Sequence, residues 1–149
     1  MLNNLNLKVK HFKYKYIILL FILFVVKSNL SAQLDSVMTK CNTLLTDDFI
    51  SDGQQYLSLI TGNQTAEFSA VFYGGNIYRV ISCGGKGDTE IIFNIYDKYR
   101  NLLFSNTDYN NTNYWNFQFE STIECFIEAK FTPGSNTSGF VVILIGLQK

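Results

Sequence analysis

Apolar residues recur at every second position through most of the chain from Gln55 onward, and this period constrains the fold more than any other feature. Residues 115–119 alternate aromatic with amide side chains. Residues 123–129 alternate Ile, Cys and Ala with Glu, apart from Phe126. Successive side chains of a strand point to opposite faces, so one face of each such segment is apolar and the other is polar and exposed to solvent. This pattern is typical of antiparallel sheets that pack one face and expose the other.

Eight segments of strand length carry this pattern, and Gly, Asn, Asp or Pro residues separate most of them. They cover residues 56–60, 67–73, 77–83, 90–97, 102–105, 114–120, 123–131 and 139–146. The stretch 141–145 is apolar on both faces, so we expect it to lie centrally in its sheet. The sequence therefore predicts a mostly β fold, an antiparallel β-sandwich (jelly-roll-like) of about eight strands.

A helical period precedes the strands. Six apolar residues share one face at i, i+3, i+4 and i+7 spacing, and Asp35 and Ser36 suit the start of a helix. The six are Leu34, Val37, Met38, Cys41, Leu44 and Leu45. Residues 47–53 then break the pattern. We expect this stripe to pack on the domain behind it; the alternative is that it binds a partner.

The first 32 residues have the form of a cleavable signal peptide. Four lysines precede an apolar run over residues 16–26, and Ser31-Ala32 offers a cleavage site before Gln33. Eleven apolar residues make a helix of about 16 Å, roughly half the length that a membrane span requires. We therefore expect an exported protein, periplasmic or secreted, with no membrane span after cleavage. The predicted organisation is a signal peptide over 1–32, an N-terminal helical segment over 33–54 and a β-sandwich domain over 55–149.

Cleavage would also change the chemistry of the chain. It removes His11, the only histidine, and leaves seven basic residues against twelve acids, a net charge of −5. An acidic domain is a poor partner for nucleic acid. Without histidine, neither a Ser-His-Asp triad nor a histidine-activated cysteine nor a histidine-ligated zinc can form. Glu124 and Glu128 share the wet face of one segment, which favours a solvated surface over a catalytic carboxylate pair.

Three cysteines remain after residue 32, so at most one internal disulfide can form. Export permits such a bond. A bridge between Cys83 and Cys125 is the first expectation, because Cys125 lies on an apolar face and Cys83 ends a strand. Bridges that involve Cys41, and buried free thiols, remain open alternatives.

The polar loop at 106–115 is the most distinctive stretch for binding. Asp108, Asn110 and Thr112 supply hard oxygens at alternate positions, and Asp97 at the preceding strand end could add another, as calcium prefers. The EF-hand glycine and the twelfth-position glutamate are missing, so a polar turn is the simpler interpretation. Aromatic residues that could stack on sugar rings gather around the same loop; they are Tyr96, Tyr99, Tyr109, Tyr114 and Trp115.

Four stretches carry a resemblance to a known family. They are NIYRV (76–80), IFNIYD (92–97), NLLFSN (101–106) and SGFVVI (138–143). They resemble the bacterial pre-peptidase C-terminal type of β-sandwich, in which a Y-x-V strand leads to an L-Y-D-x-x-G-x-L hairpin and a closing G-x-Y-x-L strand. Arg100 stands where that hairpin has glycine, and Phe140-Val141 replaces the closing tyrosine pattern. The chain after residue 32 also resembles a group of short secreted bacterial proteins with no assigned function. The resemblance implies a jelly-roll-like fold and a non-catalytic role, and it carries no catalytic residue onto this chain.

Together these features predict an exported, non-catalytic β-sandwich protein with a binding or accessory role at the cell envelope or outside the cell. We expect an envelope or extracellular partner, no nucleic acid and no cofactor. The alternative is a small calcium- or carbohydrate-binding module that uses the 106–115 loop. An enzyme is the least favoured class, because the usual base is absent and no motif replaces it.

Overall fold

The computed structural model describes residues 15–17, 34–54, 56–84, 90–134 and 138–149. The chain divides into two units, Met1–Asp35 and Ser36–Lys149. In the first unit residues 15–17 are helical, whereas the rest of the predicted signal peptide and its cleavage site lie outside the described residues. None of the helices in the described ranges combines the length and the hydropathy that a bilayer crossing needs.

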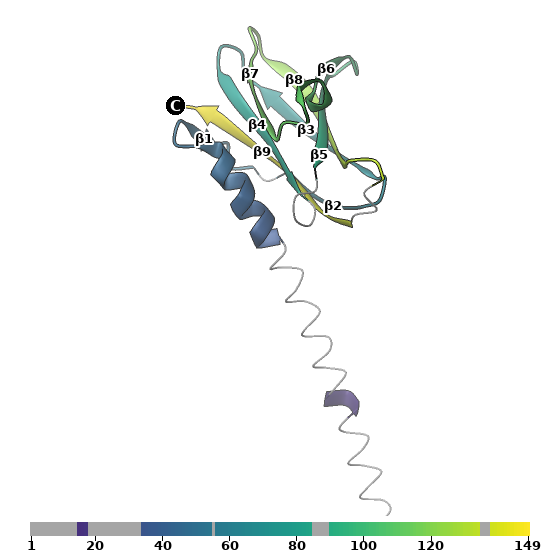
Figure 1. Ribbon diagram of the computed structural model, residues 1–149. Coiled ribbons are helices and arrows are strands. Elements are labelled where there is room, and N and C mark those ends of the chain that lie inside the picture. Colours follow the sequence, from purple (N-terminus) through teal and green to yellow (C-terminus); the bar gives the residue numbers. More distant parts are fainter. Residues whose placement is uncertain (1–14, 18–33, 55, 85–89, 135–137) are drawn as a thin grey trace, which may run out of the picture. The chain divides into compact units, whose positions relative to one another are not determined.

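The described part of the second unit forms nine strands in two antiparallel sheets (Figure 1). The strands are β1 (Phe49–Ser51), β2 (Tyr56–Thr61), β3 (Thr65–Phe72), β4 (Ile77–Gly84), β5 (Ile91–Asp97), β6 (Leu102–Ser105), β7 (Tyr114–Gln118), β8 (Ile123–Phe131) and β9 (Ser138–Gln148). Sheet A has the order β1-β9-β4-β7, with β2 also paired to β9, and sheet B has the order β3-β8-β5-β6.

The strand pairs are nested along the sequence, so that each pair encloses the next. β2 pairs with β9, β3 with β8, β4 with β7 and β5 with β6. This is the arrangement of a long antiparallel hairpin folded over into two sheets, which is a jelly roll. The predicted antiparallel sandwich is thus confirmed. The strand β1 was not predicted, because three residues are too few to show a period of two.

The core lies between the two sheets and is filled from alternate positions of each strand. Phe72, Phe93, Ile127 and Ile143 are fully buried there. Aromatic rings extend the core toward β7, where Phe104 packs edge-on against Phe117 with ring centroids 5.0 Å apart. The period of two in the sequence therefore corresponds to inward and outward side chains, as expected for half-buried strands.

Strand β9 departs from this pattern, because it is buried on both faces, as β4 also is from Val80 to Gly84. Val141, Ile143 and Ile145 face the core, whereas Val142 and Leu144 point to the outer side of sheet A and are equally inaccessible. The strand lies between β4 on one side and β1 and β2 on the other, so its predicted central position is confirmed.

A helix over residues 34–45 supplies the cover for this outer face, with its residues from 36 onward in the same unit. Val37 and Cys41 are buried, and a side chain at Gly146 of β9 would collide with Leu45. The Arg79 guanidinium, on the outer face of β4, donates to the backbone oxygen of Leu44 at 3.1 Å. A cation near the C-terminal end of a helix is favourably placed with respect to the helix dipole.

Cys41 of the helix forms a disulfide with Cys83 of β4, with 5.8 Å between their Cα atoms. This corrects the expected Cys83–Cys125 bridge. The reason is the face on which each cysteine lies. Cys83 points to the outer side of sheet A, toward the helix, whereas Cys125 points into the core from sheet B and is a buried free thiol. The core layer therefore separates these two sulfur atoms.

The bridge should stabilise the fold strongly, because it closes a loop of 42 residues in the unfolded chain. The double substitution Cys41→Ser and Cys83→Ser is expected to lower the free energy of unfolding by about 4 kcal/mol. Urea unfolding measures this. Alkylation of the denatured wild-type protein should label one cysteine before reduction and three after it. Three labels before reduction would contradict the bridge. The matched control is Cys125→Ser, which should keep the bridge intact.

Candidate binding pocket

The edge of sheet A next to β9 is interrupted, and a pocket opens at the interruption. β2 pairs with residues 138–143 of β9 and β1 pairs with residues 146–148. Between them the chain leaves the sheet in a short loop that starts at Asp52, whose backbone N–H still bonds to the oxygen of Ile145 at 3.0 Å. Gly53 then takes a positive φ of 81°, a conformation that glycine adopts without strain. This turn directs the Asp52 side chain over the gap.

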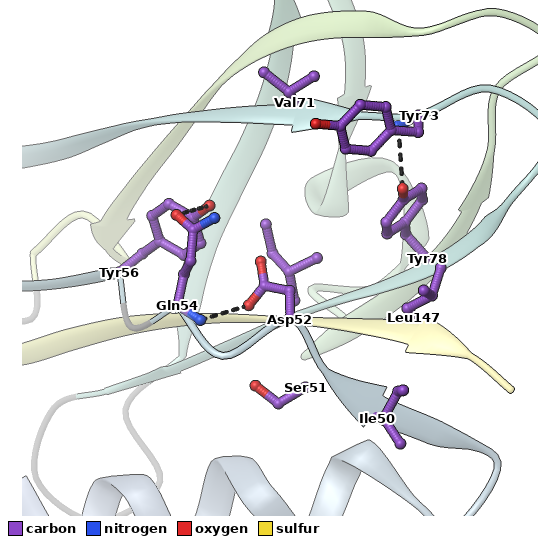
Figure 2. Close-up of a pocket in the computed structure, with 10 residues that line it drawn as sticks. Ile50, Ser51, Asp52, Gln54, Tyr56, Val71, Tyr73, Tyr78 and Leu147 are labelled. Carbon is purple, nitrogen blue, oxygen red and sulfur yellow. Dashed lines mark hydrogen bonds between the residues drawn. The ribbon is translucent and has the colours of Figure 1, made fainter.

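The pocket has a volume of about 310 Å³. Its walls come from β1 and the loop after it, from β2, from the end of β3, and from inner residues of β4 and β9. The lining residues are Ile50, Ser51, Asp52, Gln54, Tyr56, Val71, Tyr73, Tyr78, Ile145 and Leu147. Figure 2 shows the Asp52 carboxylate between the Gln54–Tyr56 pair and the Tyr73–Tyr78 pair. Asp52 is the one charged residue among these ten.

Asp52 is an exposed residue, and its carboxylate lies beside the tyrosine and aliphatic side chains of the pocket. Its Oδ1 atom accepts a hydrogen bond from the Gln54 backbone N–H at 2.9 Å. Burial raises the pKa of Asp52 above its ordinary value of 3.8, although this hydrogen bond opposes the shift. Burial also raises the pKa of Tyr56, and the negative charge of Asp52 adds to that effect. No lysine or arginine among the lining residues neutralises the carboxylate.

Two tyrosines bound the opposite side of the pocket. Tyr78 is 6% exposed, packs edge-on against Phe72 with ring centroids 5.1 Å apart, and accepts a hydrogen bond from the Tyr73 backbone N–H at 3.1 Å. Tyr78 therefore makes a fixed floor. Tyr73 itself is 62% exposed at the rim, together with half-exposed Val71 and Ile50.

A second, more open hollow of about 410 Å³ lies beyond Val71, which lines both. Asp97, Lys98, Tyr99 and Glu124 contribute to it. The Asp97 carboxylate is already used within its own turn. It accepts hydrogen bonds from the side-chain amide of Asn101 at 2.7 Å and from the backbone N–H groups of Tyr99 and Asn101 at 2.8 Å. These bonds, the Asn101 side chain first, lower the pKa of Asp97.

The residues predicted to bind calcium do not all come together. The 3-10 helix η1 (Asn106–Tyr109) lies beside the start of β5, because the Asn106 side chain bonds to Ile91 and Phe93. Asp97 lies at the other end of β5, about 13 Å beyond Phe93 at the usual rise of a strand. Within the loop Asp108 is the one carboxylate, next to Asn110 and Thr112. From outside the loop, the Glu90 carboxylate reaches it and accepts a hydrogen bond from the Asn111 side-chain amide at 2.9 Å. In the described ranges, no three His, Cys, Asp or Glu side chains gather as a metal site would require.

The aromatic residues expected around a sugar also separate. The Tyr109 and Trp115 rings lie 4.2 Å apart and both pack on Phe104. Trp115 packs against the core, whereas Tyr109 is 46% exposed. Tyr114 lies under the Arg79 guanidinium, 4.6 Å from it, on the outer side of sheet A. Tyr99 borders the second hollow. These side chains do not form one platform.

Sequence reasoning missed two residues that organise these regions. Asn106 is fully buried; its amide accepts from the Phe93 N–H at 3.0 Å and donates to the backbone oxygens of Ile91 at 2.8 Å and Thr112 at 3.0 Å. Nothing in the local sequence separates it from the other asparagines of the loop. Asp52 lies in a Ser-Asp-Gly turn, which the sequence marked only as a break in the helical pattern.

Comparisons with known proteins assign neither a family nor a function. No family model matches the chain, and no curated relative matches it significantly. The resemblance to the pre-peptidase C-terminal sandwich therefore stays an expectation. Among solved structures, PliG from Aeromonas hydrophila, a periplasmic lysozyme inhibitor of g-type lysozyme, aligns with a TM-score of 0.49 and 14% identity. The alignment covers 66% of this chain and 91% of PliG.

Two larger proteins align less well. The mosquito-larvicidal Cry4Aa toxin from Bacillus thuringiensis has a TM-score of 0.31 at 14% identity, and the alignment covers 66% of this chain and 22% of the toxin. Dimeric latent PorU from Porphyromonas gingivalis has a TM-score of 0.28 at 14% identity, with coverage of 68% and 13%.

The buried amide of Asn106 gives a first prediction. Asn106→Ala removes three hydrogen bonds and leaves the Phe93 N–H and two carbonyl oxygens without their partner. We expect a loss of about 3 kcal/mol in the free energy of unfolding, measured by urea titration. The exposed Asn113→Ala in the same loop is the matched control and should change it by less than about 0.5 kcal/mol. Equal effects of the two substitutions would contradict the role of Asn106.

The raised pKa of the Asp52 carboxylate gives a further prediction, whose size is limited because the residue is exposed and solvent screens its charge. Because its folded-state pKa is raised, the ionised form is less favourable in the folded than in the unfolded chain, and this penalty applies above the ordinary value of 3.8. Asp52→Asn should therefore raise the melting temperature at pH 7. The difference from wild type should shrink as the pH falls to 3.8 and below. An unchanged or lower melting temperature at pH 7 would refute this, with the exposed Asp108→Asn as the comparison.

Proposed function

We propose that the protein is an exported, non-catalytic domain that binds a protein partner outside the cytoplasm. The face that makes this contact is the one around the two hollows. Four exposed apolar side chains border it: Ile50, Val71, Tyr73 and Tyr99, which we call the rim. Their exposed fractions are 51%, 51%, 62% and 74%.

The observation that carries the proposal is that the two hollows are neighbours and share one exposed lining residue, Val71. Scattered apolar residues on a surface need no explanation, but apolar residues gathered around concavities mark interaction sites. Val71 lines both hollows, Ile50 and Tyr73 border the first, and Tyr99 borders the second. Tyrosine is also enriched in protein interfaces, since it combines a large ring with a polar end.

The chemistry of the second unit supports a role without catalysis. From residue 36 onward the sequence has no histidine. Burial, with a further contribution from the charge of Asp97, raises the pKa of the Cys125 thiol to about 11, so this cysteine stays protonated at neutral pH. Among the acids of sheet B, Glu67 and Glu128 are paired with Arg100 at 2.7 Å and 3.4 Å. Asp52 stands in its pocket without a second acid, and the lining has no histidine or lysine that could activate the neighbouring Ser51 hydroxyl as a nucleophile.

Export is supported by two independent features. The sequence begins with a basic segment, an apolar run and a small-residue cleavage site. The structure joins Cys41 to Cys83, and such bonds persist in oxidising compartments rather than in the cytosol.

The test is capture of a partner by the protein from residue 33 onward, with extracts of the native cell envelope and mass-spectrometric identification. We expect a partner retained by the wild type and reduced about tenfold or more by the double variant Val71→Ser and Tyr73→Ser, because both side chains are central to the rim. The control is Leu102→Ser, at a residue 54% exposed on β6, outside both hollows. It should retain the partner. Equal capture by all three proteins would contradict the proposal.

A further inference from the structure

We propose that the pocket around Asp52 receives the side chain of a lysine of the protein partner, with its ammonium group against the Asp52 carboxylate and its methylene stem along the tyrosine and aliphatic walls. This inference rests on the proposed function, and it names the group that enters the site.

Charge complementarity is the first argument. Asp52 is the one charged residue of the lining, and its Oδ2 atom has no hydrogen bond to any described residue, whereas Oδ1 is bonded to Gln54. Ser51 and Gln54 add further oxygen acceptors to the same wall. An anionic pocket without a counterion repels anions and attracts cations. A net charge of −5 over residues 33–149 acts in the same direction at longer range.

The walls fit a stem of methylene groups. Val71, Ile145 and Leu147 offer aliphatic surface, and Tyr56 and Tyr78 offer aromatic rings that also attract a cation. A lysine side chain buries its stem on apolar surface while its charged end meets a polar group. A volume of about 310 Å³ is at the lower end of the range for ligand sites and suits one side chain better than a large ligand.

The geometry favours lysine over arginine. A guanidinium is held best by two parallel hydrogen bonds to both oxygens of a carboxylate. In Asp52 the Gln54 N–H takes one of the two lone pairs of Oδ1, so a guanidinium fork would share that oxygen with the backbone, whereas Oδ2 has no donor among the described residues. An ammonium group is a compact charge with three donors that needs no such fork, and it can share them among Asp52, Ser51 and Gln54.

The experiment is a titration of the ¹⁵N-labelled protein with Nα-acetyl-lysine N-methylamide, followed by amide NMR shifts at low salt. We expect saturable shifts at Gly53, Gln54 and Tyr73, with a dissociation constant in the millimolar range, as for a single side chain. The matched probe is the same compound acetylated at Nε, which has the same stem without the charge. It should produce shifts at least about tenfold weaker.

Variants localise the effect. Asp52→Asn keeps the shape of the side chain and should weaken binding of the lysine probe about tenfold, whereas Asp108→Asn, an equal charge change elsewhere, should leave it unchanged. Equal shifts with the Nε-acetylated probe, undiminished binding to Asp52→Asn, or no saturable shift with the lysine probe would each overturn the inference. Tighter binding of n-pentylamine, which carries the same single charge, than of the lysine probe would also overturn it, because a free amine would then be the better occupant.

The two proposals fail separately. If the captured partner is lost from the Val71→Ser, Tyr73→Ser protein but bound equally by wild type and Asp52→Asn, the face binds a partner and the lysine assignment is wrong. If no partner is captured by the wild type, the proposed function fails, whatever the lysine probe shows. Both proposals are supported if Asp52→Asn no longer captures the partner and if the wild type no longer captures a partner whose lysines have been chemically acetylated.

Discussion

The burial of β9 on both faces is the constraint on which the rest of the structure depends. A strand with Val142 and Leu144 on one side and Ile143 and Ile145 on the other cannot leave either side in water. Sheet B covers the inner side. From residue 36 onward the helix covers the outer side, and the Cys41–Cys83 bond fixes it there. The central place of β9, the helix and the disulfide therefore all follow from the need to bury the apolar residues of β9 on both faces.

The same central strand explains why a pocket forms. β9 has eleven residues, whereas β2 and β1 along its edge have six and three, so neither covers it alone. Asp52 begins the loop between them and leads the chain over the gap. The interruption exposes the space between the two sheets at that end, where Tyr78 forms a floor. The proposed binding pocket thus lies where the regular strand pairing along β9 stops. The paired strands of the two sheets hold its walls in place.

The alternation of apolar and polar residues was enough to predict the sandwich and most of its strands, because a strand with one buried face carries apolar residues at every second position. The central place of β9 was predicted from the opposite pattern, a stretch that is apolar on both faces. Neither pattern was enough to pair the cysteines. That choice depends on which face of β4 carries Cys83, and the sequence shows a face only relative to its neighbours. The role of Asn106 was hidden for a similar reason: its partners, Ile91 and Phe93, are more than ten residues away. Asp52 looked like an ordinary turn residue.

The position of β9 in the chain also governs when the domain can form. It is the last in sequence of the nine described strands, yet β1, β2 and β4 all pair with it. The disulfide between the helix and β4 can form earlier, but sheet A lacks its central strand until residues 138–148 have been synthesised. Until then β1, β2 and β4 lack the partner strand that they share. Non-local pairing of this kind also makes closure slow and leaves strand edges unpaired meanwhile.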